Sequence, residues 1–329
     1  MKINRLITST LSEKGIALLL VLWVLTVLMV IVLSFSLMAR TETLSALSFK
    51  EGLEKKFVAE AGIERGIMEI FYKRLYNNQT VLLEGTEVWK TDSSPYSIQT
   101  GNLQYTVSII DESGKVDINT ISDVLLKNLF LNSGAQQEEA DTIVDSIMDW
   151  RDPDDLHRLH GAESDYYMSL PNPYKAKDAN FDTLEELLLV KGMTPEILYG
   201  DGKKKGIINF LTINSKTSQI NINAAPKEVL TSIPGITPEF ADTIIEYRNT
   251  KEITNLQEIG IPGDANNLIA PYIKTGGSNT FTIESVGHKG SEKGGYAIRA
   301  TVTITGNNTY AYLYYKSPVS INISIENSN

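Results

Sequence analysis

The hydrophobic pattern begins with an apolar run that contains no charged residue, residues 16–39. A helix of that length spans about 36 Å, because each residue adds about 1.5 Å, and about 30 Å crosses a bilayer core. Apolar residues then recur at three- and four-residue steps up to Phe71, and no proline occurs between Thr41 and Tyr76. The period predicts one helix of about 60 residues that starts in a membrane and ends packed on a folded domain.

Alternation of apolar and polar residues predicts strands on both sides of a long helical block. The predicted strands are residues 96–99, 103–110, 280–286, 297–305 and 310–315, and the helical block covers about 120–275. Gly101-Asn102 and Asn307-Asn308 are the turn residues expected between neighbouring strands. This order predicts an α+β fold, in which a long N-terminal helix packs on an antiparallel sheet and a large all-α insertion lies between the strands.

The helical block contains an internal repeat. Residues 116–119 read Val-Asp-Ile-Asn and residues 220–223 read Ile-Asn-Ile-Asn, and the helical segments 140–145 and 241–246 both begin Ala-Asp-Thr-Ile. In each copy, a short extended piece is expected to lead into two helices joined by a tight turn. Two shorter related segments are expected at 181–194 and 253–260.

One turn of the second copy, residues 233–238, reads Ile-Pro-Gly-Ile-Thr-Pro and resembles a helix-hairpin-helix motif, which is best known from DNA-binding proteins. Such hairpins bind phosphate through backbone N–H groups at a Gly-x-Gly turn. Here Thr237 replaces the second glycine, and Pro238 has no N–H. Residues 220–250 also hold two basic residues against four acidic ones. We therefore expect a compact packing unit and no nucleic-acid partner.

Composition narrows the chemistry further. The chain of 329 residues has no cysteine, which excludes disulfides, thiolate metal sites and a cysteine nucleophile. Only three histidines occur, so a zinc site built from several histidines is not expected. The net charge of −10 argues against general affinity for nucleic acid, because that affinity depends on Lys and Arg neutralising phosphates.

The segment before the apolar run, residues 1–15, is short and polar, and it includes Lys2, Arg5 and Lys14. A cleaved signal peptide would have a shorter apolar region followed by a small-residue cleavage site. A plain transmembrane anchor fits the length and the basic flank. A prepilin leader is the third interpretation. It is favoured because a Lys-Gly dipeptide directly precedes an apolar helix that continues as an amphipathic one.

The second segment that could form a functional site is rich in acidic residues. Residues 138–165 hold ten carboxylates, opposed only by Arg151 and Arg158. Residues 149–155 read Asp-Trp-Arg-Asp-Pro-Asp-Asp, and the proline indicates a loop leaving a helix. Like-charge repulsion in such a loop is removed by a hard divalent cation, and Ca²⁺ accepts six to eight oxygens. A solvated acidic surface is the alternative, and we find no nucleophile or polar partner set for catalysis.

The N-terminal segment, residues 14–25, reads Lys-Gly-Ile-Ala-Leu-Leu-Leu-Val-Leu-Trp-Val-Leu and resembles the start of the general secretion pathway K proteins. Most pilins and pseudopilins carry Glu at the fifth mature position, and the K family is known for lacking it. With Ile16 as first mature residue, the fifth is Leu20. Ile16 itself replaces the more usual Phe or Met.

The acidic segment also resembles this family. Asp-Trp-x-Asp-x-Asp, followed by Gly-Ala-Glu and a tyrosine pair, is similar to the calcium-binding loop of K-type pseudopilins. Leu156 and Ser164 stand where relatives often have acidic or polar residues. The resemblance implies one or two structural calcium ions, with ligands drawn from Asp149, Asp152, Asp154, Asp155, Glu163 and Asp165.

The resemblance covers nearly the whole chain and implies a minor pseudopilin of a type II secretion system, not an enzyme. Such a subunit initiates and caps the periplasmic pseudopilus tip and supports protein export across the outer membrane. The implied partners are the I- and J-type minor pseudopilins, the major pseudopilin, the prepilin peptidase and the inner-membrane assembly platform. The peptidase would cleave between Gly15 and Ile16 and methylate the new amine. The competing hypotheses are a membrane-anchored helix-hairpin-helix protein for DNA binding or uptake, and a type IV minor pilin.

The implied location is the Gram-negative inner membrane, with the N-terminus cytoplasmic and the bulk periplasmic, and then the pseudopilus tip. The expected divisions are a leader at 1–15, a transmembrane part at 16–39, a pilin-like domain at 40–119 and 276–329, and the helical insertion with its calcium loop at 120–275.

Overall fold

The computed structural model describes residues 10–76, 88–202, 204–261, 263–290, 294–306 and 308–320. The chain divides into two compact units, Met1–Phe57 and Val58–Asn329. A single helix, α1 (Thr10–Tyr76), contributes to both units and contains no break. The long helix predicted from the apolar period is therefore confirmed.

The first unit consists, in its described part, of α1 up to Phe57. Large apolar side chains cover this helix and are exposed, from Ile16 to Met38 and beyond. Among the described residues, α1 is the one helix long and apolar enough to cross a membrane, judged by length and composition. The hydroxyls of Thr26, Thr41 and Thr43 donate to backbone carbonyls three or four residues earlier, so these polar groups are satisfied within the helix.

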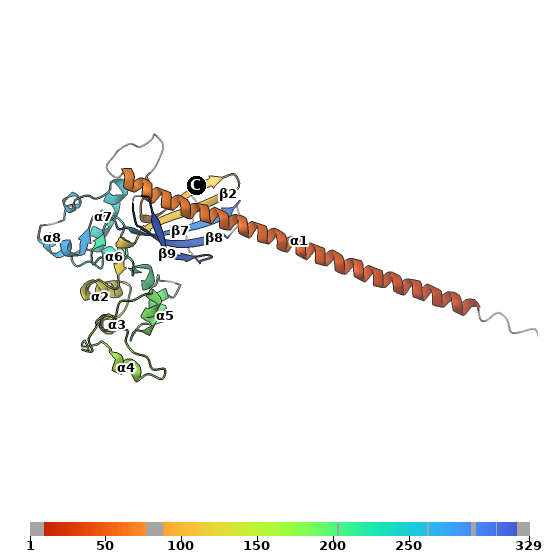
Figure 1. Ribbon diagram of the computed structural model, residues 1–329, viewed down its shortest axis with the longest axis horizontal. Coiled ribbons are helices and arrows are strands. Elements are labelled where there is room, and N and C mark those ends of the chain that lie inside the picture. The colour runs from red at the N-terminus through yellow and green to blue at the C-terminus, as the bar shows by residue number, and fades with distance from the viewer. Residues whose placement is uncertain are drawn as a thin grey trace, which may run out of the picture. The chain divides into compact units, whose positions relative to one another are not determined.

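The second unit is built around a five-stranded antiparallel sheet (Figure 1). Its strands are β1 (Asp92–Thr100), β2 (Leu103–Asp111), β7 (Thr280–Lys289), β8 (Tyr296–Ile304) and β9 (Tyr310–Lys316), in the order β1-β2-β7-β8-β9. Thr100 pairs with Leu103 across a two-residue turn, and Gly101 adopts φ +63°, as the Gly101-Asn102 turn requires. The other predicted turn, Asn307-Asn308, is described only in part, because Asn307 lies outside the described residues.

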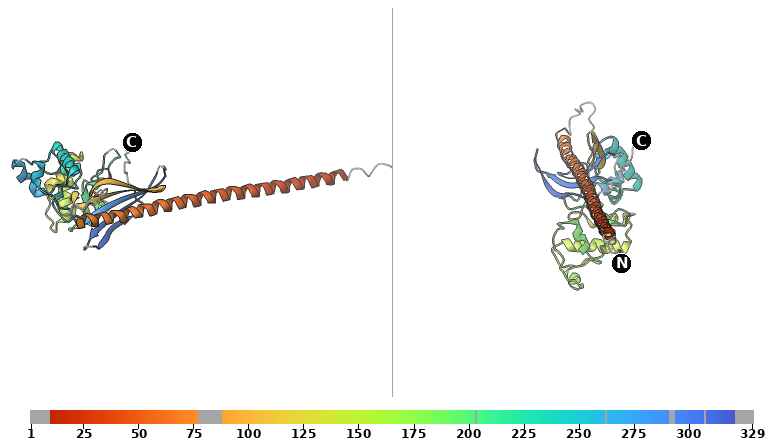
Figure 2. Two further views of the ribbon diagram at one scale, coloured as in Figure 1. Left: turned by 90° about the horizontal axis from the view of Figure 1, so that it is seen from above. Right: turned by 90° about the vertical axis from the view of Figure 1, so that its right-hand side faces the viewer.

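The last part of α1 packs along this sheet (Figure 2). Its buried residues recur with helical spacing and meet the central strands; they are Ala59, Ile63, Ile67 and Ile70 on the helix and Val107, Ile109, Ile283 and Ile298 on the strands. The approach is close at Gly62, where an added Cβ would lie 2.1 Å from Ser285 Oγ. Glycine therefore lets helix and sheet touch, and the α+β arrangement predicted from the sequence is confirmed.

The insertion runs between β2 and β7 and is mainly helical. Its first half contains η1 (Glu112–Gly114), β3 (Val116–Asp117), α2 (Asp123–Asn132), α3 (Gln137–Arg151), α4 (Ser164–Met168), η2 (Leu184–Leu189), α5 (Pro195–Tyr199), η3 (Ile207–Asn209) and β4 (Leu211–Thr212). Its second half contains β5 (Ile220–Asn221), α6 (Lys227–Leu230), α7 (Pro238–Thr250), η4 (Leu256–Ile259), α8 (Gly263–Ile269), η5 (Ala270–Tyr272) and β6 (Ile273–Lys274). Each half is closed by one short parallel pair, β3 with β4 and β5 with β6, so the extended pieces expected in the repeat pair within their own halves.

The repeat predicted from the sequence appears as repeated contacts. The side-chain amide of Asn119 donates to the carbonyl of Phe181 at 3.0 Å and accepts from its N–H at 2.8 Å. Asn223 makes the same two bonds with Ile253, both at 2.9 Å. The two copies thus place equivalent asparagines against equivalent chain segments.

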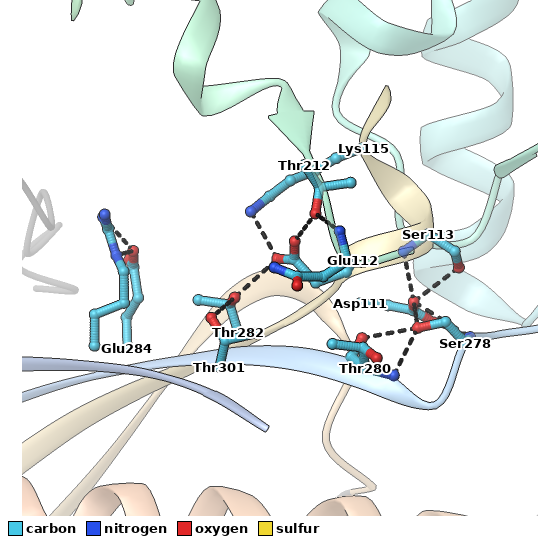
Figure 3. A network of polar contacts seen from close by, with 12 residues as sticks. Asp111, Glu112, Ser113, Lys115, Thr212, Ser278, Thr280, Thr282, Glu284 and Thr301 are labelled. Carbon is cyan, nitrogen blue, oxygen red and sulfur yellow. Dashed lines mark hydrogen bonds and ion pairs between the residues drawn. The ribbon is translucent and has the colours of Figure 1, made fainter. Parts of the chain in front are cut away.

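A buried polar network joins the sheet to the insertion (Figure 3). At the end of β2, Asp111 accepts hydrogen bonds from Ser113 and Ser278, and Asn221 of the second copy donates to it at 3.2 Å. Glu112 accepts from Thr212, from Thr282 at 2.8 Å and from Lys115 at 2.8 Å.

The electrostatics of this network favour an ionised Glu112. Burial by itself would raise the pKa of this carboxyl, but the Lys115 charge and the hydroxyl donors hold the pKa below its ordinary value. A buried carboxylate with three donors is stable only where all of them stay in place. The junction therefore fixes the start of the insertion against the sheet.

Candidate metal centre

The acidic loop leaves the buried end of α3. This helix begins with a capping box between Gln136 and Glu139 and buries its apolar face. Asp149 lies in its last turn and is fully buried. The helix ends at Arg151, and Pro153 follows directly after the C-cap residue Asp152, where it cannot continue the helical hydrogen bonds.

The carboxylate of Asp149 sits in a cradle made by the returning chain. The backbone N–H of Arg158 lies 3.4 and 3.2 Å from its two oxygens, and the Arg158 Nε lies 3.5 Å from Oδ1. An added Cβ at Gly161 would come within 1.9 Å of Oδ2, so only glycine permits this approach. Burial raises the pKa of Asp149, and the neighbouring Asp152 adds to the rise while Arg158 opposes it.

Glu163 carries a buried carboxylate with no compensating partner in the part of the chain that the structure describes. It is 2% exposed, and both carboxylate oxygens are buried without a hydrogen-bond partner. Burial raises the pKa of Glu163 to about 7, and Asp149, Asp152, Asp178 and Asp155 contribute in that order. A buried carboxylate surrounded by other carboxylates is unfavourable unless a cation joins them.

The other predicted ligands lie in two groups. Asp152 and Asp155 are electrostatic neighbours of Glu163, and Asp152 Oδ1 is buried without a hydrogen-bond partner. Burial raises the pKa of Asp152, and the Asp154 charge raises it further. Asp154 is exposed and accepts the N–H of Leu156 at 2.9 Å. Asp165 is turned toward His157, with 3.0 Å between Oδ1 and Nε2, and its side chain is 73% exposed.

Asp178 is a member of the cluster that the sequence analysis did not include. It acts on the pKa of both Glu163 and Asp152 and has the left-handed backbone conformation, φ 52°. Asparagine and aspartate tolerate this region better than most residues with a side chain. Since Asp178 lies far along the chain from the Asp-Trp-x-Asp-x-Asp pattern, no local signal marked it.

Aromatic rings at the two ends of the acidic segment pack against each other. Trp150 meets Tyr167 edge-on at 5.2 Å between ring centroids, and Tyr174 stacks on Tyr167 at 5.2 Å. Lys191 Nζ donates to the carbonyls of His160 and Gly161, at 3.2 and 2.9 Å. The ring contacts thus join the start of the loop at Trp150 to Tyr167, and Lys191 binds the returning segment at His160 and Gly161.

These residues fit a hard cation. Within the described residues, no three of the Asp, Glu and His side chains already converge as a metal site. Nevertheless, Glu163 and Asp152 present buried oxygens without partners, and Asp149 lies beside them. Oxygen-only donors in a flexible loop are the set that Ca²⁺ takes.

The predicted cleavage site and the fifth mature position lie on α1. Gly15, Ile16 and Leu20 follow one another along an uninterrupted helix, and Ile16 and Leu20 are about 60% exposed. No charged residue occurs between residues 16 and 39.

The helix-hairpin-helix turn is built for packing. Gly235 adopts φ +90°, Ile233 and Ile236 are buried, and the Thr237 hydroxyl caps α7 by accepting the N–H of Phe240 at 3.2 Å. The two basic residues of this region are both engaged. Lys227 pairs with Asp242 at 2.6 Å, and Arg248 is buried and donates to backbone carbonyls. The geometry offers no cation for a phosphate among residues 220–250.

The fold and the site define a class: a pilin-like fold whose sheet carries a large helix-hairpin-helix insertion with an acidic loop. Residues 102–199 match the family model of type II secretion system protein K, and residues 215–260 match the helix-hairpin-helix motif. The fold is shared with a chain in the crystal structure of the GspK-GspI-GspJ complex from the enterotoxigenic Escherichia coli type 2 secretion system. The TM-score is 0.60 at 16% identity, over 85% of this chain and 100% of that chain.

Two curated relatives agree with this match. The chain is 34% identical over 74 residues to the type II secretion system protein K of Pectobacterium carotovorum subsp. carotovorum, over 22% of this chain and 21% of the relative. It is 38% identical over 69 residues to the putative type II secretion system protein K of Escherichia coli strain K12, over 21% of each. The matched segments span about a fifth of the length of these relatives.

The match of residues 102–199 to the type II secretion system protein K model, the two curated relatives and the shared fold therefore confirm the resemblance to K-type minor pseudopilins noted from the sequence. This is a family of structural pseudopilins and not of enzymes.

Proposed function

We propose that this protein initiates and caps the periplasmic pseudopilus of a type II secretion system and so supports protein export across the outer membrane. The observation that carries the proposal is the combination of a pilin-like helix and sheet with a bulky insertion between β2 and β7. An insertion of this size would obstruct a second copy stacked above it. A subunit that only has neighbours below it does not meet that obstruction.

The uncharged position 20 supports the same role. In pilin-like filaments, the Glu at the fifth mature position is thought to pair with the N-terminal amine of the preceding subunit. A carboxylate left unpaired among apolar helices is costly, so a subunit with that Glu needs a predecessor. Leu20 carries no such requirement, while the amine of Ile16 remains available to the next subunit.

The processing and topology follow from this proposal. The prepilin peptidase cleaves after Gly15 and methylates Ile16, the mature helix stays in the inner membrane, and the second unit lies in the periplasm. The assembly platform and the major pseudopilin then extend the filament below. One solved structure with the same fold is the GspK-GspI-GspJ complex, which supports the I- and J-type minor pseudopilins as the nearest partners.

A structural calcium site is the second part of the proposal. Asp149, Asp152 and Glu163 would hold the ion, because Asp149 and Glu163 are buried, Asp152 is half-buried with its Oδ1 buried, and this Oδ1 and both Glu163 oxygens are without hydrogen-bond partners. Asp155 and Asp178 lie close enough to act on Glu163, and Asp154 and Asp165 stay candidate ligands. When bound, the ion supplies positive charge that offsets their repulsion. No catalytic role is proposed for it.

The tip role is tested by disulfide cross-linking in cells, because the chain has no cysteine of its own. A cysteine replacing Ala17 should cross-link to a cysteine near the fifth mature residue of the next pseudopilin. Two copies of this protein, one with Ala17→Cys and one with Leu20→Cys, should not cross-link to each other. Abundant homotypic cross-links would identify a repeating shaft subunit and contradict the proposal.

The calcium site is tested by thermal unfolding of the full chain in detergent micelles. Calcium should raise the melting temperature, since a ligand that binds only the folded state stabilises it. Asp152→Ala combined with Asp154→Ala should abolish the rise. An unchanged rise in the double variant would place the bound ion elsewhere.

A further inference from the structure

Arg151, the last residue of α3, turns away from the acidic loop. Its Nη1 donates to the carbonyl of Ile118, and its Nη2 donates to the carbonyl of Ile121 at 2.8 Å. Both carbonyls belong to the tight turn after β3, which is closed by the N–H of Ile121 bonding to the Asp117 carbonyl at 2.9 Å. The guanidinium therefore fastens the end of α3 to the start of the first copy.

The second copy makes the equivalent contact. Near the end of α7, Arg248 Nη1 donates to the carbonyls of Ile222 and Ala225, at 2.8 and 2.7 Å. These two residues follow the strand β5 with the same spacing that Ile118 and Ile121 follow β3. Arg151 stands eleven residues after Ala140 and Arg248 seven after Ala241, so the two arginines lie at different places along their helices but reach the same pair of carbonyls in the repeated unit.

What differs is the chain that follows each arginine. In the second copy, only a few residues separate Arg248 from Ile253, which Asn223 holds. In the first copy, the acidic loop and α4 separate Arg151 from Phe181, which Asn119 holds. The acidic segment is thus an insertion between two anchor points that both copies share, and Arg151 is the anchor at its start.

We propose that Arg151 is a positioning residue for a divalent cation held by the acidic loop, an inference that rests on the calcium site proposed above. Asp149 lies two residues before Arg151 in the same helical turn, and Asp152 follows it directly. Fastening the helix end fixes the separation of these two carboxylates before any ion binds. Outer contacts that orient ligands in this way commonly change metal affinity by 10- to 100-fold.

The positive charge of Arg151 cannot itself explain a gain in calcium affinity. Arg151 is positive and lies near Asp152, so its charge opposes the binding of another cation. A loss of calcium affinity on weakening its hydrogen bonds therefore has to come from geometry. Arg151→Lys keeps the charge but cannot reproduce two parallel N–H donors on a planar fork.

The test compares Arg151→Lys with Arg248→Lys, the same change at the arginine that binds the corresponding two carbonyls of the second copy, in the full chain in detergent micelles. Calcium affinity is measured by isothermal titration calorimetry, and stability by thermal unfolding without calcium. We expect Arg151→Lys to bind calcium at least tenfold more weakly than the parent. Arg248→Lys should lose stability and keep its affinity within twofold.

Amide hydrogen exchange gives a second readout that does not require bound calcium. Exchange at residues 149–163 should increase in Arg151→Lys and stay at the parent level in Arg248→Lys. Parent-like affinity in Arg151→Lys, or an equal loss of affinity in both variants, would overturn the positioning role alone. A parent that binds no calcium would overturn the calcium site itself, and the positioning role with it.

Discussion

Replacing Glu163 with Gln removes a buried charge and keeps the side chain's size. The structure gives this carboxylate no hydrogen-bond partner, and burial with four nearby aspartates raises its pKa from 4.5 to about 7. One pKa unit corresponds to about 1.4 kcal/mol, so ionising Glu163 costs the calcium-free fold about 3 kcal/mol. The Gln amide is also buried, which costs about 1 kcal/mol. We therefore expect a net gain of about 2 kcal/mol in the free energy of unfolding.

The sign of the pH dependence follows from the raised pKa. Because the folded-state pKa of Glu163 lies above the unfolded value, the penalty is absent below about pH 4.5 and complete above about pH 7. The advantage of Glu163→Gln should therefore be largest at pH 8 and should shrink as the pH falls through this window. With calcium present the parent should be the more stable of the two proteins, because its Glu163 offers the ion a charged carboxylate and the variant offers only a neutral amide.

The assay is urea unfolding followed by tryptophan fluorescence, at pH 8 and pH 5, in a calcium chelator and again in calcium. Glu42→Gln, an exposed change on α1, is the control and should alter stability by less than about 0.5 kcal/mol. A variant less stable than the parent at pH 8 without calcium would refute the reasoning about the unpaired carboxylate. Equal stabilisation of both proteins by calcium would show that Glu163 is not a calcium ligand.

Two further predictions concern the fold and use the same unfolding assay. Gly62→Ala should cost about 2 kcal/mol, because the new methyl group would clash with Ser285 between α1 and the sheet. Gly52→Ala, in open space on the same helix, should instead stabilise it by up to about 1 kcal/mol, and equal effects would contradict the close-approach argument. Lys115→Met should cost about 3 kcal/mol, since it leaves the buried Glu112 carboxylate without its cation. That loss should shrink in acid, where Glu112 is protonated, and a loss independent of pH would argue against an ionised Glu112.

Much of this architecture is readable from local periodicity. The helix α1 was predictable because a charge-free run and its amphipathic continuation repeat at every turn of one element. The β1–β2 hairpin was predictable because two alternating runs flank Gly101-Asn102, a turn that sets the register by itself. The repeat within the insertion was visible because both copies retain the same short sequence pattern. In each case the deciding interactions lie within one element or between neighbours in the chain.

The candidate site was readable only in part. The composition of residues 149–165 indicated a cation site, but it ranked the carboxylates alike. The tertiary structure separates them: Glu163 is buried without partners, Asp165 is exposed beside His157, and Asp178 joins from a distant segment. Desolvation and charge–charge repulsion depend on which chains lie alongside, which no local pattern encodes.

The sequence by itself therefore determined the long helix, the strands, the helical insertion and the presence of an acidic loop, because each depends on periodicity or composition. The tertiary structure decided that Arg151 and Arg248 bind corresponding carbonyls of the two copies, that Glu112 joins the sheet to the insertion, and that the Glu163 carboxylate is buried without a partner. These properties arise from contacts between residues far apart in the chain, and their energies exist only once the fold brings those residues together.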